Sequence, residues 1–578
     1  MASITVAPEI VLRPVQRVEL QVILMTILLA VVAFLVIYPM IQITMQSFQV
    51  SKPGEAARWG LEGWRAVFTE QALQKAACNT ISIAAVRQAI ALVAAVFIAW
   101  LLARTDVPGG KIFEFVFWLA FFMPALTVTL SWILILDPQF GLFNQAVRNG
   151  LSALGVADVG KSGPLNIYSF WGIIWVHLMG TTIALKVMIL TPTFRNMNSA
   201  FEEASRVAGA SNLGTMVRIF VPLMLPAIVA ITFLALLRSL EAFEIEQILG
   251  TPIGLYVFST WIYDTLYQHI PRYDAVSALA VVMVVVAIGL IFLQRWMISS
   301  RQYTTLTGQF QGQKLRLGKL RWVAFAFLAV MTFLIIAVPL GGSLMGTFMK
   351  LFGFFIEEPW TLKQWQTALN DRLLLRALQN TFVLAIGTAL AAAFIHSLIA
   401  YVIVRTRYYA RGTLDFITWL PFTVPGIILS LALLTMFLQP QFRPLYGTMF
   451  TLVLALVISG MPFAVQIMKS NLMQLGNELE EASRVSGGSW WYTYRRIVLP
   501  LISPTLVVIG VISFIAAARN ISTVALLSNT AIRPLSIMQL DYIAEGKYEV
   551  AAVIATILLF LSLGLAIIAR VFGYKGVS

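Results

Sequence analysis

The chain contains many long apolar stretches, and this feature limits its fold more strongly than any other. A helix needs about 20 apolar residues to cross the hydrocarbon core of a bilayer, and about twelve stretches of the sequence meet that length. Because 59% of the 578 residues are hydrophobic and only 11% are charged, a water-soluble core is excluded. The expected spans are centred on Val32, Ile90, Ala125, Val176, Leu234, Val286, Val330, Leu390, Ile428, Leu456, Val511 and Phe560. The predicted fold class is therefore an all-α polytopic membrane protein.

The basic residues gather at the ends of the apolar stretches. The chain carries 40 Lys and Arg against 26 Asp and Glu, which gives a formal net charge of +14. Residues 295–321 contain six basic residues and no acidic residue. Since the cytoplasmic loops of membrane proteins are rich in Lys and Arg, this segment and both termini are expected in the cytoplasm of a multi-pass inner-membrane protein. The charge excess thus fits a lipid bilayer, and no nucleic-acid partner is expected.

The second half of the chain repeats the first half in the same direction. Four short patterns recur at one offset of 301 residues (380 − 79). They pair Asn79-Thr80 with Asn380-Thr381, Arg104-Thr105 with Arg405-Thr406, Trp118-Leu119 with Trp419-Leu420, and Pro124 with Pro425. Later patterns recur at an offset of 278 (481 − 203), because an outer loop near residues 137–165 is longer in the first half. Two parallel six-helix repeats are therefore predicted, related by an axis near the membrane normal.

This repeat divides the chain into four segments. Residues 1–74 hold an N-terminal tail, the first span and an outer loop; 75–296 form the first transmembrane domain; 297–375 hold a cytoplasmic linker, the seventh span and an outer loop; 376–571 form the second transmembrane domain. The basic stretch from Ser300 to Lys319 then joins two once-separate halves.

The most informative pattern occurs once in each half, in a long cytoplasmic loop. Residues 202–209 read EEASRVAG and lead to IFVP at 219–222, and residues 480–487 read EEASRVSG and lead to IVLP at 497–500. The spacing from glutamate to glycine, isoleucine and proline is the same in both halves. It predicts a short helix, a turn at Gly209 or Gly487, and a second amphipathic helix that a proline ends. Exposed acids and arginines on such a loop suit docking against a soluble partner.

The pattern of EAA, three residues, Gly, nine residues and I-x-L-P resembles the loop of type I ABC-importer permeases. It departs from the family pattern at Ser205, Ser483 and Val221. In that family the loop forms a coupling helix that sits in a groove of the ATP-binding subunit. The resemblance therefore implies that contact with the ATPase is carried by Glu202, Glu203, Ala204, Gly209, Glu480, Glu481, Ala482 and Gly487.

The resemblance also implies a function and partners. Single-chain permeases with two such halves most resemble those of ferric-iron importers, and thiamine and phosphonate systems are relatives. The expected protein is the permease subunit of an ATP-driven, binding-protein-dependent importer of ferric iron. Its expected partners are two ATP-binding cassette subunits and a periplasmic or lipoprotein solute-binding protein. Thiamine, phosphonate or another small solute is the alternative substrate, and a secondary transporter with a similar number of spans is the alternative class.

No enzymatic centre, cofactor or metal site is expected. The chain lacks a GxxxxGK[ST] sequence, so ATP hydrolysis is assigned to partner subunits. Cys78 is the only cysteine, which excludes an intramolecular disulfide and a cysteine zinc cluster. His177, His269 and His396 are widely separated and form no ligand cluster.

Four polar residues expected deep inside the fifth and eleventh spans are candidates for a gate on the translocation path. They are Arg238, Glu241, Arg519 and Asn520. Because Arg519 matches Glu241 at the 278-residue offset, these two side chains are expected to face each other across the axis between the halves. The alternative is a structural ion pair, since buried polar groups also join membrane helices.

Two acidic residues and two prolines are further residues to place relative to the translocation path. Counting about 1.5 Å per residue along the fifth span places Glu244 and Glu246 near the outer interface. In the third and ninth spans, Pro124 and Pro425 either kink helices around the pathway or are tolerated bends of a kind common in membrane helices.

Overall fold

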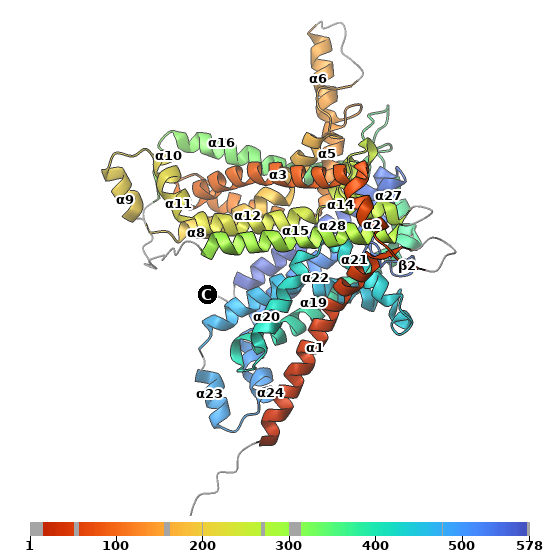
Figure 1. The fold of residues 1–578 in the computed structure, drawn as a ribbon. Helices are drawn as coiled ribbons and strands as arrows, with labels where there is room; N and C mark the ends of the chain where they lie inside the picture. Colours follow the sequence, from red (N-terminus) through yellow and green to blue (C-terminus); the bar gives the residue numbers. More distant parts are fainter. Residues whose placement is uncertain are drawn as a thin grey trace, which may run out of the picture.

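The computed structural model describes residues 15–50, 57–154, 162–198, 200–267, 272–299, 314–476 and 478–574. Most of these residues lie in helices (Figure 1). Within these ranges, eight helices are long and apolar enough to cross a membrane, and the number rises to as many as 12 if each of four bent pairs forms one span. The predicted all-α polytopic fold is confirmed, and every expected span centre lies in one of these helices.

The eight single spans belong equally to the two halves. In the first half they are formed by α1 (Val15–Gln46), α3 (Gln71–Arg104), α7 (Phe170–His177) with η1 (Leu178–Thr182) and α8 (Ile183–Arg195), and α15 (Tyr273–Ser299). In the second half they are formed by α16 (Leu320–Thr332) with η4 (Phe333–Ala337) and α17 (Val338–Phe348), α19 (Arg372–Arg405), α22 (Met449–Gln474) and α28 (Tyr548–Tyr574). Many of their exposed side chains are large and apolar, as expected where lipid is the solvent.

Two further spans are sharply bent at a proline. They join α4 (Gly110–Ala120) to α5 (Ala125–Leu136) at 106°, and α20 (Arg411–Trp419) with η5 (Leu420–Thr423) to α21 (Gly426–Phe437) at 109°. Pro124 and Pro425 stand directly before α5 and α21, with ψ of 137° and 144°. A proline has no N–H to donate and disfavours a helical residue before it, so each proline breaks its span. The kinks expected at these residues are present as sharp breaks.

The other two bends join the long loops to spans. The loops begin with α9 (Ala200–Val207) and α23 (Glu478–Val485), and α10 (Asn212–Thr215) follows α9. In the first half, η2 (Met216–Phe220) and α11 (Val221–Leu223) meet α12 (Leu225–Leu240) at 69°. In the second half, α24 (Trp490–Thr493), η7 (Tyr494–Val498) and α25 (Leu499–Leu501) meet α26 (Ser503–Arg519) at 74°.

Equivalent helices pack in the same way in the two halves. α3 lies against α8 and α12 in the first half, as α19 lies against α22 and α26 in the second. α12 also contacts α15, as α26 contacts α28. The loop helices α9 and α23 lie at the same end of the molecule, which we call the loop end (Figure 1). The two repeats therefore run in parallel, as predicted.

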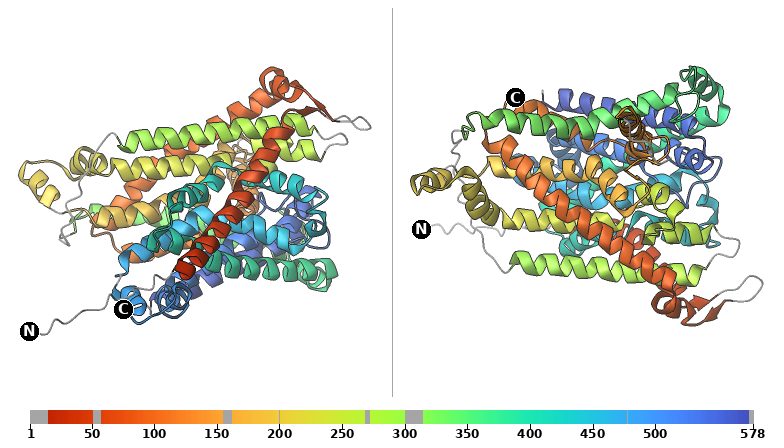
Figure 2. Two further views of the ribbon diagram at one scale, coloured as in Figure 1. Left: turned by 60° about the horizontal axis from the view of Figure 1, so that its bottom comes forward. Right: turned by 90° about the horizontal axis from the view of Figure 1, so that it is seen from above.

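The first helix of each half packs against the opposite half. α1 lies along α20 and α21 (Figure 2), and Thr26 Oγ1 is 3.1 Å from the Tyr408 hydroxyl. α17 lies against α5, where Ser131 Oγ donates a hydrogen bond to Pro339 O at 2.7 Å. Helices in lipid lack a hydrophobic driving force to associate, so such hydrogen bonds help to join them. Because each half packs its first helix against the other half, the two halves are interlocked.

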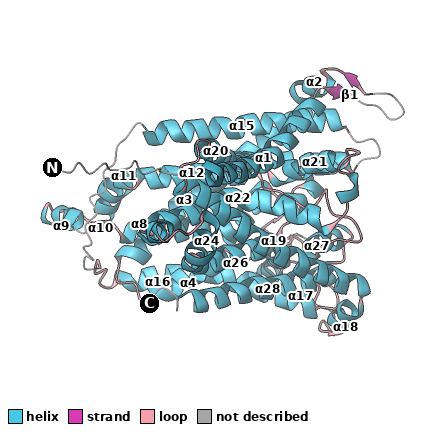
Figure 3. Cartoon of the chain, turned by 90° about the horizontal axis from the view of Figure 1, so that it is seen from below, coloured by secondary structure: helices cyan, strands magenta, loops and turns pink. Residues whose placement is uncertain are grey.

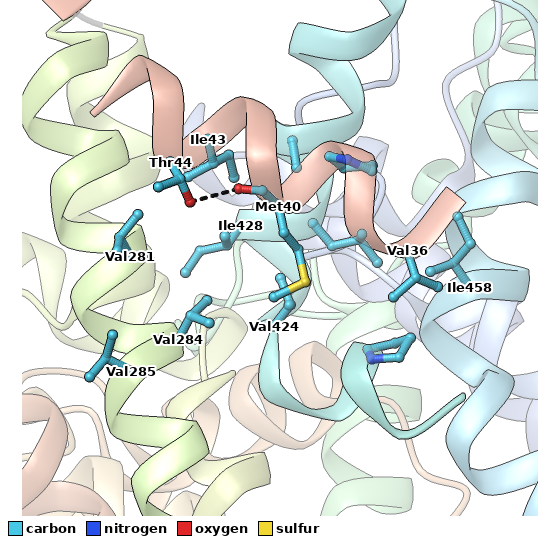
Figure 4. Close-up of a pocket in the computed structure, with 14 residues that line it drawn as sticks. Val36, Met40, Ile43, Thr44, Val281, Val284, Val285, Val424, Ile428 and Ile458 are labelled. Carbon is cyan, nitrogen blue, oxygen red and sulfur yellow. Dashed lines mark hydrogen bonds between the residues drawn. The ribbon is translucent and has the colours of Figure 1, made fainter. Parts of the chain in front are cut away.

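An apolar cavity of about 220 Å³ lies where α1 and α15 meet α21 and α22. Its lining includes Val36, Met40, Val284 and Ile428 (Figure 4). The polar member of the lining, Thr44, donates its hydroxyl to Met40 O at 2.8 Å within α1. A cavity lined in this way offers no partner to a charged solute.

Short elements complete the fold. β1 (Gln49–Val50) and β2 (Arg58–Trp59) pair antiparallel beside α2 (Glu62–Thr69), with Gln49 opposite Trp59 (Figure 3). α6 (Leu142–Ala153) projects from the body and occupies the longer outer loop predicted for the first half (Figure 1). The remaining short helices are α13 (Glu244–Leu249), η3 (Thr251–Ile253), α14 (Phe258–Leu266), α18 (Lys363–Asn370), η6 (Arg443–Leu445) and α27 (Leu535–Ala544).

Candidate coupling loops and gate

Each long loop turns at a glycine with a left-handed backbone. The φ angle is +79° at Gly209 and +81° at Gly487. A Cβ atom at either position would meet no other atom within 4 Å, so only the backbone conformation restricts the residue type. Glycine adopts such a φ without steric cost, and it commonly ends a helix in this way. The glycine turn predicted for both loops is present.

A hydrogen bond between hydroxyl groups closes each turn. Ser205 Oγ lies 2.8 Å from Thr215 Oγ1, and Ser483 Oγ lies 2.8 Å from Thr493 Oγ1. All four residues are buried. The two serines are the positions at which the loops depart from the alanine of the family pattern, and the sequence alone assigned them no role. Serine and threonine recur ten residues apart in both halves, and this recurrence is the signal that could have revealed the contact.

An arginine at the end of α3 or α19 holds the base of each loop. Arg405 Nη2 donates to Leu472 O and Leu475 O, both at 2.6 Å. The equivalent Arg104 donates through Nη1 to Met197 O at 3.2 Å. A guanidinium presents several donors in one plane, so it can satisfy the last carbonyls of a neighbouring helix. Both arginines served above only as markers of the repeat, whereas the structure gives them a role in positioning the loops.

Glu480 points into the body of the protein. Its carboxylate lies 3.4 Å from Arg405 Nε and accepts a hydrogen bond from the Tyr401 hydroxyl at 3.0 Å. Only 9% of its side chain is exposed. The resemblance implied a direct contact between Glu480 and the ATPase, and the structure instead gives Glu480 an internal contact that fixes α23 to α19. The physical reason is that a carboxylate in this setting is stabilised by the adjacent guanidinium.

The outer surface of each loop exposes a valine at the same position. Val207 and Val485 end α9 and α23, and each is 90% exposed. Ala204, Ala482 and Glu481 are exposed as well. Single exposed apolar residues are common on proteins, so the informative feature is the match between the two loops. The side chains of Glu202 and Glu203 lie outside the described part of the chain.

Two arginines reach across the boundary between the halves. Arg519 Nη1, at the end of α26, donates to Phe121 O and Met123 O at 3.0 Å each, and its guanidinium lies 5.7 Å from the centre of the Phe121 ring. Arg238, in the last turn of α12, lies 5.9 Å from the centre of the Phe422 ring. Phe121 and Phe422 are equivalent at the 301-residue offset, and each lies just before the break in a bent span. Each half therefore places an arginine against the bent span of the other half.

This arrangement differs from the Glu241–Arg519 contact expected from the repeat offset. No ion pair joins these two side chains, both of which belong to the described residues, and Arg519 binds backbone carbonyls instead. Arg238, one turn before Glu241, makes the contact equivalent to that of Arg519. The offset compares backbone positions, whereas a long arginine side chain reaches its partner from a turn away. Asn520 forms a local turn in which its Oδ1 accepts from Thr523 N at 3.0 Å.

The candidate gate is built from cations, aromatic rings and carbonyl oxygens. Within the part of the chain that the structure describes, no three or more His, Cys, Asp or Glu side chains are grouped to hold a metal ion. His177 lies in α7 and His396 in α19, whereas His269 lies outside the described residues. Guanidinium groups against ring faces and carbonyls form contacts that are strong in a medium of low dielectric constant.

Comparison with known proteins matches two segments of the chain. The family model described as "Binding-protein-dependent transport system inner membrane component" matches residues 91–303 and 393–573. The "Putative ferric transport system permease protein FbpB 1" of Haemophilus influenzae is 29% identical over 370 residues, which cover 62% of this chain and 57% of the relative. The "Ferric transport system permease protein FbpB" of Actinobacillus pleuropneumoniae is 27% identical over 402 residues, which cover 68% of this chain and 57% of the relative. The matched part of the chain thus spans little more than half the length of these relatives.

A solved structure is also similar to part of the chain. It is the crystal structure of a bacterial ABC transporter involved in the import of the acidic polysaccharide alginate. The similarity has a TM-score of 0.36 and 20% sequence identity, and it covers 45% of this chain and 98% of that chain.

Proposed function

Because the chain belongs to the family of binding-protein-dependent transport system inner membrane components, we propose that it forms the translocation pathway of an ATP-driven importer. The two segments matched by the family model fall in the two repeats, so one chain supplies both halves of the pathway. The proposed transmembrane domains are residues 75–296 and 376–571. ATP hydrolysis belongs to separate subunits, and the permease itself performs no chemistry.

The pair of equivalent loops is the observation that carries this proposal. Both loops turn at a glycine with positive φ, both are closed by a Ser–Thr hydrogen bond, and both are held at the base by an arginine. Two such loops at one end of the molecule suit two copies of an ATP-binding subunit, one docked on each loop. The proposed contact surface comprises Glu202, Glu203, Ala204, Gly209, Glu481, Ala482 and Gly487, with Glu480 acting from within.

The loop end is proposed to face the cytoplasm, together with both termini. The basic linker supports this orientation, since Leu315 N donates to Arg104 O at 2.8 Å and Asp106 N donates to Leu315 O at 3.1 Å. These bonds hold the basic residues after 313 beside the turn that follows α3, and basic residues favour the cytoplasmic side. The solute-binding protein then docks at the opposite end.

Arg238, Glu241, Arg519 and Asn520 are proposed to form the gate of the pathway. The arginines hold the bent spans of opposite halves, so contacts between the halves close the path, and their separation opens it. Glu241 and Asn520 lie directly after the ends of α12 and α26, in the segments that follow these arginines.

Ferric iron is the proposed substrate, because the two relatives described above are named ferric transport permeases. The test is uptake of radiolabelled ferric iron by vesicles that contain the permease, its ATP-binding subunits and its solute-binding protein. We expect iron to accumulate with ATP and not with ADP. If the vesicles take up thiamine or phosphonate with ATP but take up no iron, that solute is the substrate and the iron assignment is wrong. Uptake that needs an ion gradient and no ATP would contradict the proposal of an ATP-driven importer. It would indicate a secondary transporter.

A further inference from the structure

A group of six polar side chains lies inside the helical bundle of the first half. Its members are Arg87 and Gln88 of α3, His177 of α7, Lys186 of α8, Ser239 of α12 and Glu246 of α13. Three charged members of the group are almost completely enclosed: Lys186 is fully buried, and the side chains of Arg87 and Glu246 are 4% and 1% exposed. Ionisable groups inside a membrane protein are costly, so their presence calls for a role.

Arg87 lies at the centre of the contacts. Its Nε donates to Ser239 Oγ at 3.1 Å, and its Nη1 lies 3.8 Å from Glu246 Oε1 and 2.8 Å from His177 Nδ1. His177 Nε2 lies 2.7 Å from the same Glu246 oxygen. One guanidinium thus contacts α12 and α13 at the same time.

Gln88 and Lys186 add to the contact with α12. Gln88 Nε2 donates to Ser239 Oγ at 2.6 Å and to Ala235 O at 3.1 Å. Lys186 Nζ donates to Gln88 Oε1, which fixes the orientation of the amide. The end of α12 is therefore held by α3, and α3 is held by α8.

Ser239 and Glu246 lie at the two ends of residues 239–246, which we call the gate segment of the first half. Ser239 follows Arg238 directly, and Glu246 lies two residues after Glu244. Between them runs the turn from α12 to α13, which contains Glu241. The network therefore fixes both ends of the segment that the first half contributes to the boundary between the halves.

The second half carries no charged residue at the matching positions. At the two repeat offsets, the six positions are occupied by Thr388, Ala389, Ala455, Ala464, Ala517 and Val524. The gate segment of the second half is held by Arg519 to the carbonyls of Phe121 and Met123 in the first half. Within its own half it is held by the local turn at Asn520 and by Ser536 Oγ of α27, which donates to Asn520 O at 2.7 Å. One gate segment is thus anchored by charges in its own bundle, whereas the charge that anchors the other, Arg519, acts across the boundary.

We propose that Arg87 is a positioning residue for the gate, which it serves by holding Ser239 and Glu246 and thereby the segment between them. This inference rests on the gate proposed above. The first half supplies a fixed edge, and the second half supplies the edge that moves when the contacts of Arg519 break. Such supporting contacts matter because a functional site is held in its working geometry by the residues behind it.

The test compares a double variant with a control at the matched position of the second half. Arg87→Gln combined with Glu246→Gln removes both members of this charge pair, so neither is left buried without the other. Thr388→Ala changes the buried residue that replaces Arg87 in the second half. Iron uptake and ATP hydrolysis are measured in the same vesicles, with the ATP consumed per iron ion as the readout. We expect this ratio to rise by about tenfold or more in the double variant, since broken buried charge networks typically have large effects, and to stay unchanged in Thr388→Ala.

A second variant guards against poor folding of the first. Ser239→Ala removes the hydroxyl that accepts from Arg87 Nε and Gln88 Nε2, and it leaves Arg87 paired with Glu246. We expect the ratio to rise by about threefold or more, in line with two lost hydrogen bonds. If either well-accumulated variant retains the wild-type ratio, the network only stabilises packing and the proposal fails. If the wild-type chain and Thr388→Ala also fail to transport iron with ATP, the proposed function is what fails.

Discussion

ATP-driven uptake falls to less than about a tenth of the wild-type rate when Gly209 and Gly487 are both replaced by valine. The reason is that a left-handed backbone costs a non-glycine residue about 1–2 kcal/mol, and a β-branched residue more. Both glycines have φ near +80°. The strained chain moves toward an allowed φ and displaces α9 and α23 from the helices that follow. The spans do not depend on these turns, so insertion in the membrane is unchanged. Uptake and the stimulation of ATPase activity by the solute-binding protein are both measured.

Gly412→Val is the matched control for this experiment. Gly412 lies in the first turn of α20, has no left-handed φ, and would place its Cβ in open space. The control should keep normal uptake and ATPase stimulation. Full retention of both activities in the Gly209→Val, Gly487→Val variant would rule out the coupling role of the loops.

Replacing Arg519 with glutamine should open the gate without ATP. The substitution removes the two hydrogen bonds to Phe121 O and Met123 O. A hydrogen bond to a charged group is worth about 1.5–3 kcal/mol. The loss of two such bonds therefore shifts the equilibrium between the closed and open gate toward the open state by at least about a hundredfold. Arg238→Gln loses the contact with the Phe422 ring, which is worth about 0.5–2 kcal/mol, so its effect on the boundary is smaller. Leak of preloaded iron from vesicles without ATP measures both effects.

The accumulated amount of protein separates the gate from a structural role. A gate predicts leaky vesicles with normal amounts of assembled complex, whereas a structural contact predicts poor accumulation of the permease. Arg533→Gln is a control, since Arg533 pairs with Asp541 at 2.7 Å with 40% of its side chain exposed. If vesicles that contain normal amounts of the Arg519→Gln variant retain their preloaded iron, the gate role of Arg519 is excluded.

The sequence was sufficient for the architecture because the relevant signals are local and repeated. Apolar length locates each span, and the twin EEASRV patterns locate the loops and indicate the family, which is confirmed. The glycine turns also followed from the sequence, since the pattern stops a helix at the same residue in both halves. The exchange of α1 and α17 between the halves did not follow, because apolar spans carry no sequence signal for their neighbours.

The side-chain contacts of the gate region were the least predictable part. Glu246 was expected near the outer interface by counting residues along one helix, but α12 ends at Leu240 and the chain turns before α13. Glu246 is buried against His177, a contact that residue counting did not predict, and its partner Arg87 comes from a helix more than 150 residues away in sequence. Arg238 likewise reaches across the boundary from a position that the repeat offset does not mark. Such contacts depend on how helices turn and pack, which residue spacing alone does not record.

The central claim is that each of the two loops docks one ATP-binding subunit, and site-directed cross-linking tests it most directly. Cys78 is the only cysteine, so Cys78→Ser provides a background into which Val207→Cys and Val485→Cys are introduced. Both valines are 90% exposed on their loops. We predict that each cysteine alone cross-links to one ATP-binding subunit, and that the pair yields a product with two subunits per permease. Cross-linking at neither position, or cross-linking to the solute-binding protein instead, would contradict the account.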